Sequence, residues 1–373
     1  MSEFKSPNFR NEDGSAAPDI VGVTTFTSPY YFVPPSGTTA ERPSGDGLAP
    51  GMLRFNTDIG RLEVWRGDHW ATILGESPNL GVNGALGARG LFGGGSTPTY
   101  INTIDYITIS TTGNAFDFGD LTQVRVSTAA CSSNIRALFG GGYSPGNTNT
   151  IDYITISITG NALDFGDLSV PRHAHAGCSS PTRGVFGASA SPGANNTIDY
   201  VTISSTGNAQ DFGDLSVARR DASACSSSIR GVWAGGITPT YINTIDYITI
   251  STIGNATDFG DLTDVVRGGA ACSSSTRGLF GGGYTPTVLN AIDYITIATL
   301  GNANNFGDLT LARNYISACS SSIRGVWGGG NAPTGTNTID YVTIQAQGNA
   351  VDFGDLTAAK PGIGACSNAH GGL

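Results

Sequence analysis

The chain has 373 residues, of which 54 are glycine, and only 13% of them are charged. Its formal net charge of -10 argues against binding nucleic acid through phosphates, which requires a basic surface. No apolar run approaches the ~18 residues that a membrane-spanning helix needs. Glutamate, lysine and methionine are scarce, whereas glycine, threonine, serine and isoleucine are abundant, and this balance excludes a mainly helical fold. We therefore expect an all-β protein that binds neither nucleic acid nor a membrane.

Residues 1–50 contain Pro34-Pro35, Pro43 and many small polar residues. This composition predicts an extended anchoring arm rather than a domain. Four aromatic side chains form an apolar patch in the arm, and we expect this patch to be buried against a partner. They are Phe26, Tyr30, Tyr31 and Phe32.

Residues 51–78 form the predicted attachment segment, a β-hairpin with its turn at Ile59-Gly60. Apolar and polar residues alternate on both sides of this turn, as expected of two half-buried strands. An isolated hairpin is only marginally stable in water, so this one needs the rest of the chain, another subunit or a larger assembly. Phe55, Trp65 and Trp70 are the hairpin residues that we expect to make the attachment.

The hairpin resembles a segment of phage tail-fibre and related virion proteins, above all those of cyanophages. The resemblance rests on Pro-Gly-Met-Leu-Arg-Phe-Asn-Thr-Asp at 50–58, Leu-Glu-Val-Trp-Arg-Gly at 62–67, Trp70 and the lead-in at 33–43. It implies a virion structural protein, assembled in the host cytoplasm and bound to other virion proteins through residues 1–78. Because such fibres are often trimers, the resemblance also implies a homo-oligomer, with a trimer favoured.

From residue 92 to residue 373 the chain consists of six copies of one 47-residue unit, without insertion or deletion. The cysteines keep this spacing at Cys131, Cys178, Cys225, Cys272, Cys319 and Cys366. The tyrosines of Ile-Asp-Tyr keep it as well, at Tyr106, Tyr153, Tyr200, Tyr247, Tyr294 and Tyr341. Self-similarity at a fixed period of this length indicates a repeat architecture, with propeller blades among the leading candidates.

Each unit is predicted to contain four short strands, which in one copy are 270–273, 277–283, 291–297 and 305–309. β-Branched residues fill these runs and turn residues separate them, as is typical of strands. Four strands in one repeat match a single propeller blade, and a helical repeat would need helix-forming residues that the units do not contain.

The unit resembles a kelch repeat. The shared features are Gly281-Gly282 at the end of the second strand, Tyr294 in the third, Phe306 in the fourth and Arg313 between units. The unit differs from the family in having Phe rather than Trp in the fourth strand, and in its constant length. The resemblance implies a kelch-like β-propeller, and the six units imply six blades over residues 79–373.

The points in the repeat at which the first unit begins and the last unit stops predict how the ring closes. The last unit stops after a first strand, 363–367, whereas the first unit begins at a second strand, 89–95. We therefore expect the C-terminal strand to complete the first blade and to cover its edge. Residues 80–86 are the alternative occupant of this place.

Three residue types repeat in every unit, and a role in all six favours structure over ligand binding. One cysteine per inner strand predicts buried free thiols, because neighbouring copies should lie too far apart for a disulfide and no metal-ligand spacing is present. We expect the aspartate of Ile-Asp-Tyr, which begins with Asp105, and a repeated arginine to pair or to satisfy strand-end backbone groups. These arginines are Arg89, Arg136, Arg183, Arg230, Arg277 and Arg324.

No catalytic motif is present in the sequence: there is no nucleophile elbow, phosphate-binding loop or His-Glu-x-x-His. The Asp-x-x-Asp of the fourth strand, as at Asp117 and Asp120, lacks the dense oxygen ligands of a calcium loop. His173 and His175 lie two positions apart in one loop, and we expect them to be exposed polar residues. A metal-binding pair is the alternative. We predict no catalytic residue, no metal and no cofactor.

Comparison of the six copies shows that two loops vary most, the one between the second and third strands and the one that leads from the fourth strand to the next unit. In a four-stranded antiparallel blade both loops emerge on the same face. Diversified loops on a rigid scaffold are what a binding surface needs, and tyrosine and arginine are common anchors, although neutral drift is the alternative. The predicted binding residues are Tyr100, Tyr143, Arg172, His173, His175, Arg219, Arg220, Asp221, Tyr241, Tyr284, Asn314 and Tyr315.

These features together predict a non-enzymatic virion protein, with a tail fibre or adhesin favoured, whose propeller contacts a host surface polysaccharide or receptor. A capsid, tail or baseplate decoration or connector protein is the alternative within that class. A propeller glycan hydrolase or lyase is the alternative from another class, and it would need carboxylates with arginine or histidine at the channel mouth. A cellular kelch-like interaction protein is the third.

Overall fold

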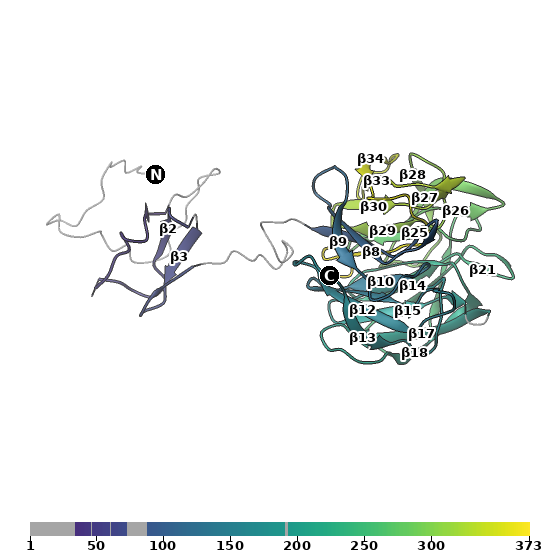
Figure 1. Cartoon of the computed structure of the whole chain (residues 1–373), viewed down its shortest axis with the longest axis horizontal. Coiled ribbons are helices and arrows are strands. Elements are labelled where there is room, and N and C mark those ends of the chain that lie inside the picture. Colours follow the sequence, from purple (N-terminus) through teal and green to yellow (C-terminus); the bar gives the residue numbers. More distant parts are fainter. Residues whose placement is uncertain (1–33, 46, 60, 73–87, 191–192) are drawn as a thin grey trace, which may run out of the picture. The chain divides into compact units, whose positions relative to one another are not determined.

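The computed structural model describes residues 34–72 without 46 and 60, and residues 88–373 without 191 and 192 (Figure 1). Contacts divide the chain into two compact units, residues 1–75 and 76–373. Every regular element among the described residues is a β-strand, which confirms the all-β prediction. The aromatic patch of the arm (Phe26, Tyr30, Tyr31 and Phe32) and the segment 80–86 lie outside the described residues.

Within the described ranges the structure contains no helix long and apolar enough to cross a membrane.

The first unit contains the hairpin that the alternating pattern predicted. Strand β2 (Leu53–Asn56) pairs antiparallel with β3 (Arg61–Trp65), so that Leu53 lies opposite Val64 and Phe55 opposite Leu62. Two strands that the pattern did not predict extend the sheet. Strand β4 (Trp70–Thr72) pairs antiparallel with β3, and β1 (Ser36–Gly37) pairs parallel with β2.

One face of this small sheet buries charge instead of apolar side chains. Arg54, Asn56 and Glu63 are almost wholly buried. The Glu63 carboxylate accepts hydrogen bonds from the Arg42 guanidinium and, at 3.1 Å, from Asn56 Nδ2, and Arg54 Nη1 lies 3.8 Å away. The bond from Arg42 is the main reason that the pKa of Glu63 is lowered. An ion-pair network therefore holds the segment before β2 against the sheet.

The second unit is built from six sheets, each with a first, second, third and fourth strand in antiparallel order. The first strands are β10 (Ala129–Ser132), β14 (Ala176–Ser179), β19 (Ser223–Ser226), β25 (Ala270–Ser273), β29 (Ser317–Ser320) and β35 (Gly364–Ser367). The second strands are β11 (Arg136–Gly140), β15 (Arg183–Gly187), β20 (Arg230–Ala234), β26 (Arg277–Thr285), β30 (Arg324–Gly328) and β5 (Arg89–Gly93).

The outer half of each sheet consists of the third and fourth strands. The third strands are β12 (Thr150–Thr155), β17 (Ala194–Thr202), β23 (Thr244–Thr249), β27 (Thr287–Thr296), β33 (Thr338–Thr343) and β8 (Thr103–Thr108). The fourth strands are β13 (Leu163–Asp167), β18 (Gln210–Arg219), β24 (Thr257–Asp261), β28 (Asn304–Asp308), β34 (Val351–Asp355) and β9 (Phe116–Asp120). Short pairs in the loops complete the described strands: β6 (Ser96–Thr97) with β7 (Thr99–Tyr100), β16 (Ser189–Ala190) with β17, β21 (Ile237–Thr238) with β22 (Thr240–Tyr241), and β31 (Asn331–Ala332) with β32 (Thr334–Gly335).

The register is the same in every sheet, because the sequence repeats without a shift. In one sheet Cys131 lies opposite Leu138, which lies opposite Tyr153. In the sheet that contains β5, the first strand comes from the other end of the chain: β35 pairs with β5, and Cys366 lies opposite Leu91.

The core lies between neighbouring sheets, whose apolar faces pack against one another. One cluster joins Cys131, Leu138 and Phe165 from the sheet of β10–β13 to Phe186 and Val201 from the next sheet. The inner strands approach so closely that an added Cβ at Gly184 would lie 2.5 Å from Cys131 Sγ. Sheet-to-sheet packing therefore requires the small residues of the repeat. Candidate binding residues are then to be sought in the loops at the two ends of the strands.

Candidate functional site

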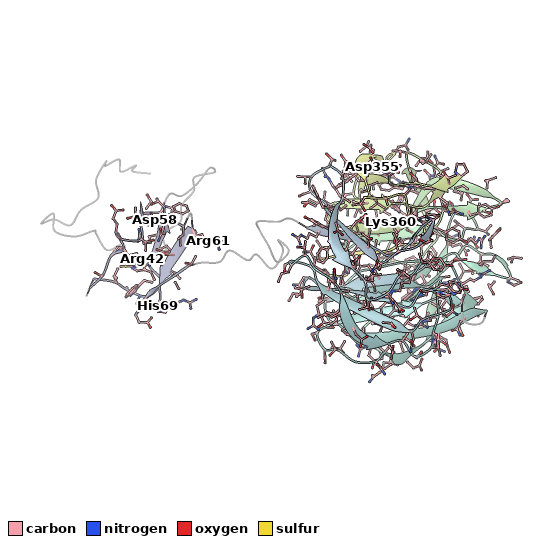
Figure 2. All side chains as sticks on the ribbon, in the orientation of Figure 1. Arg42, Asp58, Arg61, His69, Asp355 and Lys360 are labelled. Atoms are coloured by element: carbon pink, nitrogen blue, oxygen red, sulfur yellow. The ribbon has the colours of Figure 1, made fainter. Side chains whose placement is uncertain are left out.

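In five units the aspartate of Ile-Asp-Tyr forms a fully buried ion pair with a basic residue at or just after the end of the fourth strand of the preceding sheet. Arg125 Nη2 lies 2.8 Å from Asp152 Oδ2, and neither side chain is exposed. The same pair recurs in four other places: Arg172–Asp199 at 2.9 Å, Arg219–Asp246 at 3.2 Å, Arg313–Asp340 at 2.9 Å and Lys360–Asp105 at 3.0 Å. Lys360 is fully buried within the repeat region (Figure 2).

This pairing corrects two predictions. The aspartate was expected to pair with the arginine that repeats at the start of the second strand, and it pairs with a different arginine. Arg172 and Arg219 were predicted to bind a ligand, but both are fully buried in these pairs and cannot contact one. Their 47-residue spacing with Arg125 and Arg313 was the signal of a structural role, although it lies inside a loop that otherwise varies.

The arginine at the start of the second strand joins neighbouring sheets in another way. The Arg89 guanidinium lies over the ring of Tyr106 at 4.8 Å, and its Nη1 donates a hydrogen bond of 2.8 Å to the carbonyl oxygen of Ile156 in the next sheet. The corresponding arginines of the other five units make both contacts too. The expected role in satisfying backbone groups is thus confirmed, and the role is structural.

All six cysteines are free and buried, as the spacing predicted. Burial raises the pKa of every thiol, to about 12 at Cys225 and at Cys366. A thiol with so high a pKa is neutral near pH 7 and is a poor nucleophile or ligand. Among the described residues no group of three or more histidine, cysteine or acidic side chains could hold a metal ion.

A chain of hydroxyl groups links the inner strands at one end of the sheets. Ser179 Oγ donates a hydrogen bond of 2.8 Å to the carbonyl oxygen of Ser132, and Ser226 Oγ donates one of 2.7 Å to that of Ser179. The equivalent serines continue the pattern to Ser367. His370 lies against these serines, with its Nε2 3.1 Å from the carbonyl oxygen of Ser132.

A second chain of hydrogen bonds links the variable loops at the other end. The amide of Ala174 donates to the carbonyl of Ser127, and the amide of Asp221 donates to that of Ala174. Gly268, Tyr315 and Gly362 continue it, and the amide of Ser127 donates to Gly362. All six residues have φ between 50° and 68°, a left-handed conformation that costs energy in a side-chain-bearing residue. The loops are thereby held at fixed positions around one centre.

The two variable loops emerge on the same face, as predicted, because each pairs with the other. Val126 bridges to Tyr143, His173 to Ala190, Arg220 to Ile237, Arg267 to Tyr284 and Asn314 to Asn331. In every bridge the first residue follows a fourth strand, and the second lies in the connection between a second and a third strand or, for Tyr284, at the end of the second strand β26. We call the surface that these loops form the variable face.

Tyr100, Tyr143 and His173 form the first aromatic cluster on the variable face. The ring centres of Tyr100 and Tyr143 are 5.9 Å apart, and those of Tyr143 and His173 are 5.6 Å apart. Tyr100 is exposed and the other two are half-buried. His173 Nδ1 lies 2.7 Å from the amide oxygen of Asn147, and burial lowers the pKa of this histidine.

The second cluster surrounds Arg267, a residue that the sequence analysis did not single out. Its guanidinium lies 5.6 Å from the ring centres of Tyr241 and Tyr284 and 6.0 Å from that of Tyr315. Its Nη1 is 3.5 Å from Asp221 Oδ2. Burial raises the pKa of Asp221 and that of Tyr315. Four predicted binding residues therefore meet at one half-buried cation.

A cavity at the centre of the variable face is lined by two consecutive residues from each of six loops. They are Ser127-Thr128, Ala174-His175, Asp221-Ala222, Gly268-Gly269, Tyr315-Ile316 and Gly362-Ile363. Within the described part of the chain, Thr128 Oγ1 and both ring nitrogens of His175 have no hydrogen-bond partner. His175 was predicted as a surface residue, yet it is only 7% exposed, and burial holds its pKa well below the usual value.

In the first unit, the predicted attachment residues lie on both faces of the small sheet, and one of these faces is apolar and open. Leu53 and Leu62 are 45% and 37% exposed, and Phe55 is half-buried on the same face. Trp65 and Trp70 contact each other with ring centres 5.5 Å apart, and Trp70 Nε1 donates to the carbonyl of Pro43. Trp65 and Trp70 are thus brought together on the face of Glu63, where the Arg54 guanidinium lies 5.8 Å from the Trp70 ring centre, and Phe55 lies on the opposite face.

Neither the family models nor the curated proteins contain a match to this chain.

Proposed function

We propose that the chain is a phage virion structural protein whose repeat region is a six-bladed β-propeller. In this proposal the variable face contacts a host surface polysaccharide, and residues 1–78 attach the protein to other virion proteins. A tail fibre or adhesin is the favoured location.

Two series of hydrogen bonds support the propeller interpretation, because each runs from unit to unit and ends at the unit where it began. The serine hydroxyl chain runs through six first strands and is completed by Ser132 Oγ, which donates to the carbonyl of Ser367 at 2.8 Å. The arginine contacts are completed by Arg324, which donates to the carbonyl of Ile109. A ring of six sheets satisfies both series without a break, and β35 is the clasp of the first blade.

The observation that carries the host-contact proposal is the pair of aromatic clusters on the variable face. Tyr100 and Tyr241 are 141 residues apart, which is three repeat lengths, and so are Tyr143 and Tyr284. In a six-membered ring three units correspond to opposite sides, so the two clusters flank the central cavity. Tyrosine rings are amphipathic and stack on sugar rings. The arrangement suits an extended glycan that crosses the face.

The attachment proposal rests on the open apolar face of β2 and β3. Leu53, Phe55, Leu62 and Val64 lie on that face, while the opposite face already buries its charges. An exposed apolar sheet face is a site of association. This is the segment that resembles phage virion proteins, so its partner would be a virion protein or a second copy of the chain.

The test is binding of the full-length protein to surface polysaccharide purified from the host of the particle that carries it. Tyr241→Ala and Tyr284→Ala are each expected to weaken binding about tenfold or more, as removal of an aromatic anchor does. Ile158→Ala and Ile229→Ala are matched controls in the uniform loops, where both side chains are highly exposed. Loss of binding in these controls, with the tyrosine variants unchanged, would overturn the variable-face proposal.

Cryo-electron microscopy of the particle tests the location. Density for the protein on tail fibres with the variable face directed outward is expected. Density on the capsid or baseplate with that face packed on a neighbour would make the protein a decoration or connector. Absence of the protein from the particle would overturn the virion proposal.

A further inference from the structure

Five of the six units hold a cation at one internal position. Arg125 shows the geometry: Nη2 contacts Asp152 Oδ2 at 2.8 Å and the carbonyl oxygen of Phe139 at 3.0 Å, and Nη1 contacts the carbonyl oxygen of Thr150 at 2.9 Å. Arg219 and Arg313 make the same three contacts. Each position is therefore a receptor for a guanidinium group, formed by one carboxylate and two carbonyl oxygens.

The remaining unit, which contains Asp293, has the guanidinium-binding groups but not the cation. At the 47-residue spacing Val266 replaces the arginine, while the carboxylate remains as Asp293. Asp293 is only 6% exposed, and it keeps the hydrogen bonds that its counterparts have, from the amide and hydroxyl groups of Thr263. In the described part of the chain, Asp293 has no lysine, arginine or histidine within ion-pair distance.

A cavity lies where the guanidinium is found in the other units. Val266, Phe280, Ala291 and Asp293 are among the residues that line it. Phe280 and Ala291 are the counterparts, three repeat lengths on, of Phe139 and Thr150, whose carbonyl oxygens bind Arg125. Thr263 and Asp264 also line the cavity and are exposed residues, so the cavity reaches the surface beside a second carboxylate.

Arg267 does not supply the missing charge, although it follows Val266 directly. Its guanidinium lies among Tyr241, Tyr284 and Tyr315 on the variable face and contacts Asp221. Burial, followed by the charge of Asp264, raises the pKa of Asp293, which is the expected behaviour of a carboxylate without a counter-ion.

We propose that this cavity is a binding site for an alkylguanidinium or primary alkylammonium cation, which Asp293 and the carbonyl groups of Phe280 and Ala291 would bind. Lys360, which contacts Asp105 at 3.0 Å in another unit, indicates that an ammonium group also suits the receptor. The ligand is either a free small cation or an arginine or lysine side chain of a partner. This proposal does not depend on the proposed role in the virion.

The test is isothermal titration of the full-length protein with methylguanidinium. One equivalent is expected to bind the wild type. Val266→Arg, which places a covalent guanidinium in the cavity, and Asp293→Asn, which removes the charge, are each expected to weaken binding about tenfold or more. Tetramethylammonium, a cation that cannot donate hydrogen bonds, is expected to bind more weakly by a similar factor.

Arg313→Val is the matched gain-of-site variant, because it reproduces the same cavity beside Asp340. It is expected to bind two equivalents of methylguanidinium if it remains folded. Equal binding of methylguanidinium to the wild type, Val266→Arg and Asp293→Asn would overturn the proposal, and so would an equal affinity for tetramethylammonium. Titration with N-acetyl-arginine amide distinguishes the two sources: binding as tight as that of methylguanidinium supports a partner's side chain, and much weaker binding supports a free small cation.

Discussion

Ser132 Oγ donates a hydrogen bond of 2.8 Å to the carbonyl oxygen of Ser367, although 235 positions separate the two residues. The equivalent bonds elsewhere join strands that are one repeat apart in the sequence, for example Ser179 to Ser132. The bond between Ser132 and Ser367 therefore marks the seam at which the last strand of the chain, β35, meets the first complete unit. At this seam β35 also pairs with β5 through Cys366 and Leu91.

Deletion of residues 363–373 is expected to destabilise the repeat region severely. It removes β35, exposes the edge of β5 and uncovers Leu91 and Phe92, which are fully buried. Ser367→Ala, the mild control, removes the hydroxyl that donates to the carbonyl of Ser320 and accepts from its amide, and it is expected to cost about 1–3 kcal/mol. Urea denaturation followed by tryptophan fluorescence measures both, and a truncated chain with the wild-type midpoint would contradict the clasp.

Asp340→Asn and Asp293→Asn provide a matched pair at the same position of two units. Asp340→Asn leaves the Arg313 guanidinium buried without its counter-ion, so a loss of about 3–5 kcal/mol in the free energy of unfolding is expected. Asp293→Asn breaks no ion pair and is expected to be neutral or stabilising at pH 7. Chemical denaturation at pH 7 measures the difference, and equal losses in the two variants would contradict the assignment of Val266 as the exception.

The strand pattern and the face shared by the variable loops were predictable from the sequence, because both follow from local periodicity. Six copies without a shift fix one register for all, so one correct assignment of Cys131, Leu138 and Tyr153 serves every unit. The extension of the N-terminal hairpin by β1 was not predictable. A parallel two-residue pairing leaves no alternation in the sequence.

The site was harder to predict than the fold. Five of the six units offer two basic residues that could meet the aspartate of Ile-Asp-Tyr, and only the three-dimensional packing decides that Arg125, and not Arg136, contacts Asp152. Arg172 and Arg219 were assigned to the surface because their neighbours vary. Arg267 was not predicted as a site residue. It lies one position after the place that Arg125 and its counterparts occupy in the repeat, and this displacement is visible only when the loops are aligned residue by residue.

The six thiols are expected to resist modification by Ellman's reagent at neutral pH as long as the protein is folded. Burial raises the pKa of Cys225 and Cys366 to about 12, so the thiolate fraction is negligible, and the side chains are packed between sheets. All six should react rapidly in urea. Rapid reaction of even one cysteine in the native protein would contradict the packing of that inner strand.

His370 is expected to make stability fall as the pH decreases from about 6.5 to about 4. Its Nε2 donates to the carbonyl of Ser132, while its Nδ1 accepts a bond of 3.0 Å from the amide of Gly372, so the geometry requires the neutral ring. Burial accordingly lowers its pKa to about 4. A histidine whose pKa is lower in the folded state than in the unfolded one stabilises the fold above the unfolded pKa, and this contribution is lost as the ring becomes protonated.

The measurement is the urea midpoint as a function of pH for the wild type and for His370→Asn, which keeps a polar side chain that does not titrate. The difference between the two proteins isolates His370 from the other shifted groups, including Asp293, whose raised pKa acts with the opposite sign. The wild type is expected to lose more stability than the variant between pH 6.5 and pH 4. Parallel curves would mean that the segment from His370 to Leu373 leaves the serine chain without a change in global stability, and the ring of His370 would then titrate near its ordinary pKa in proton NMR.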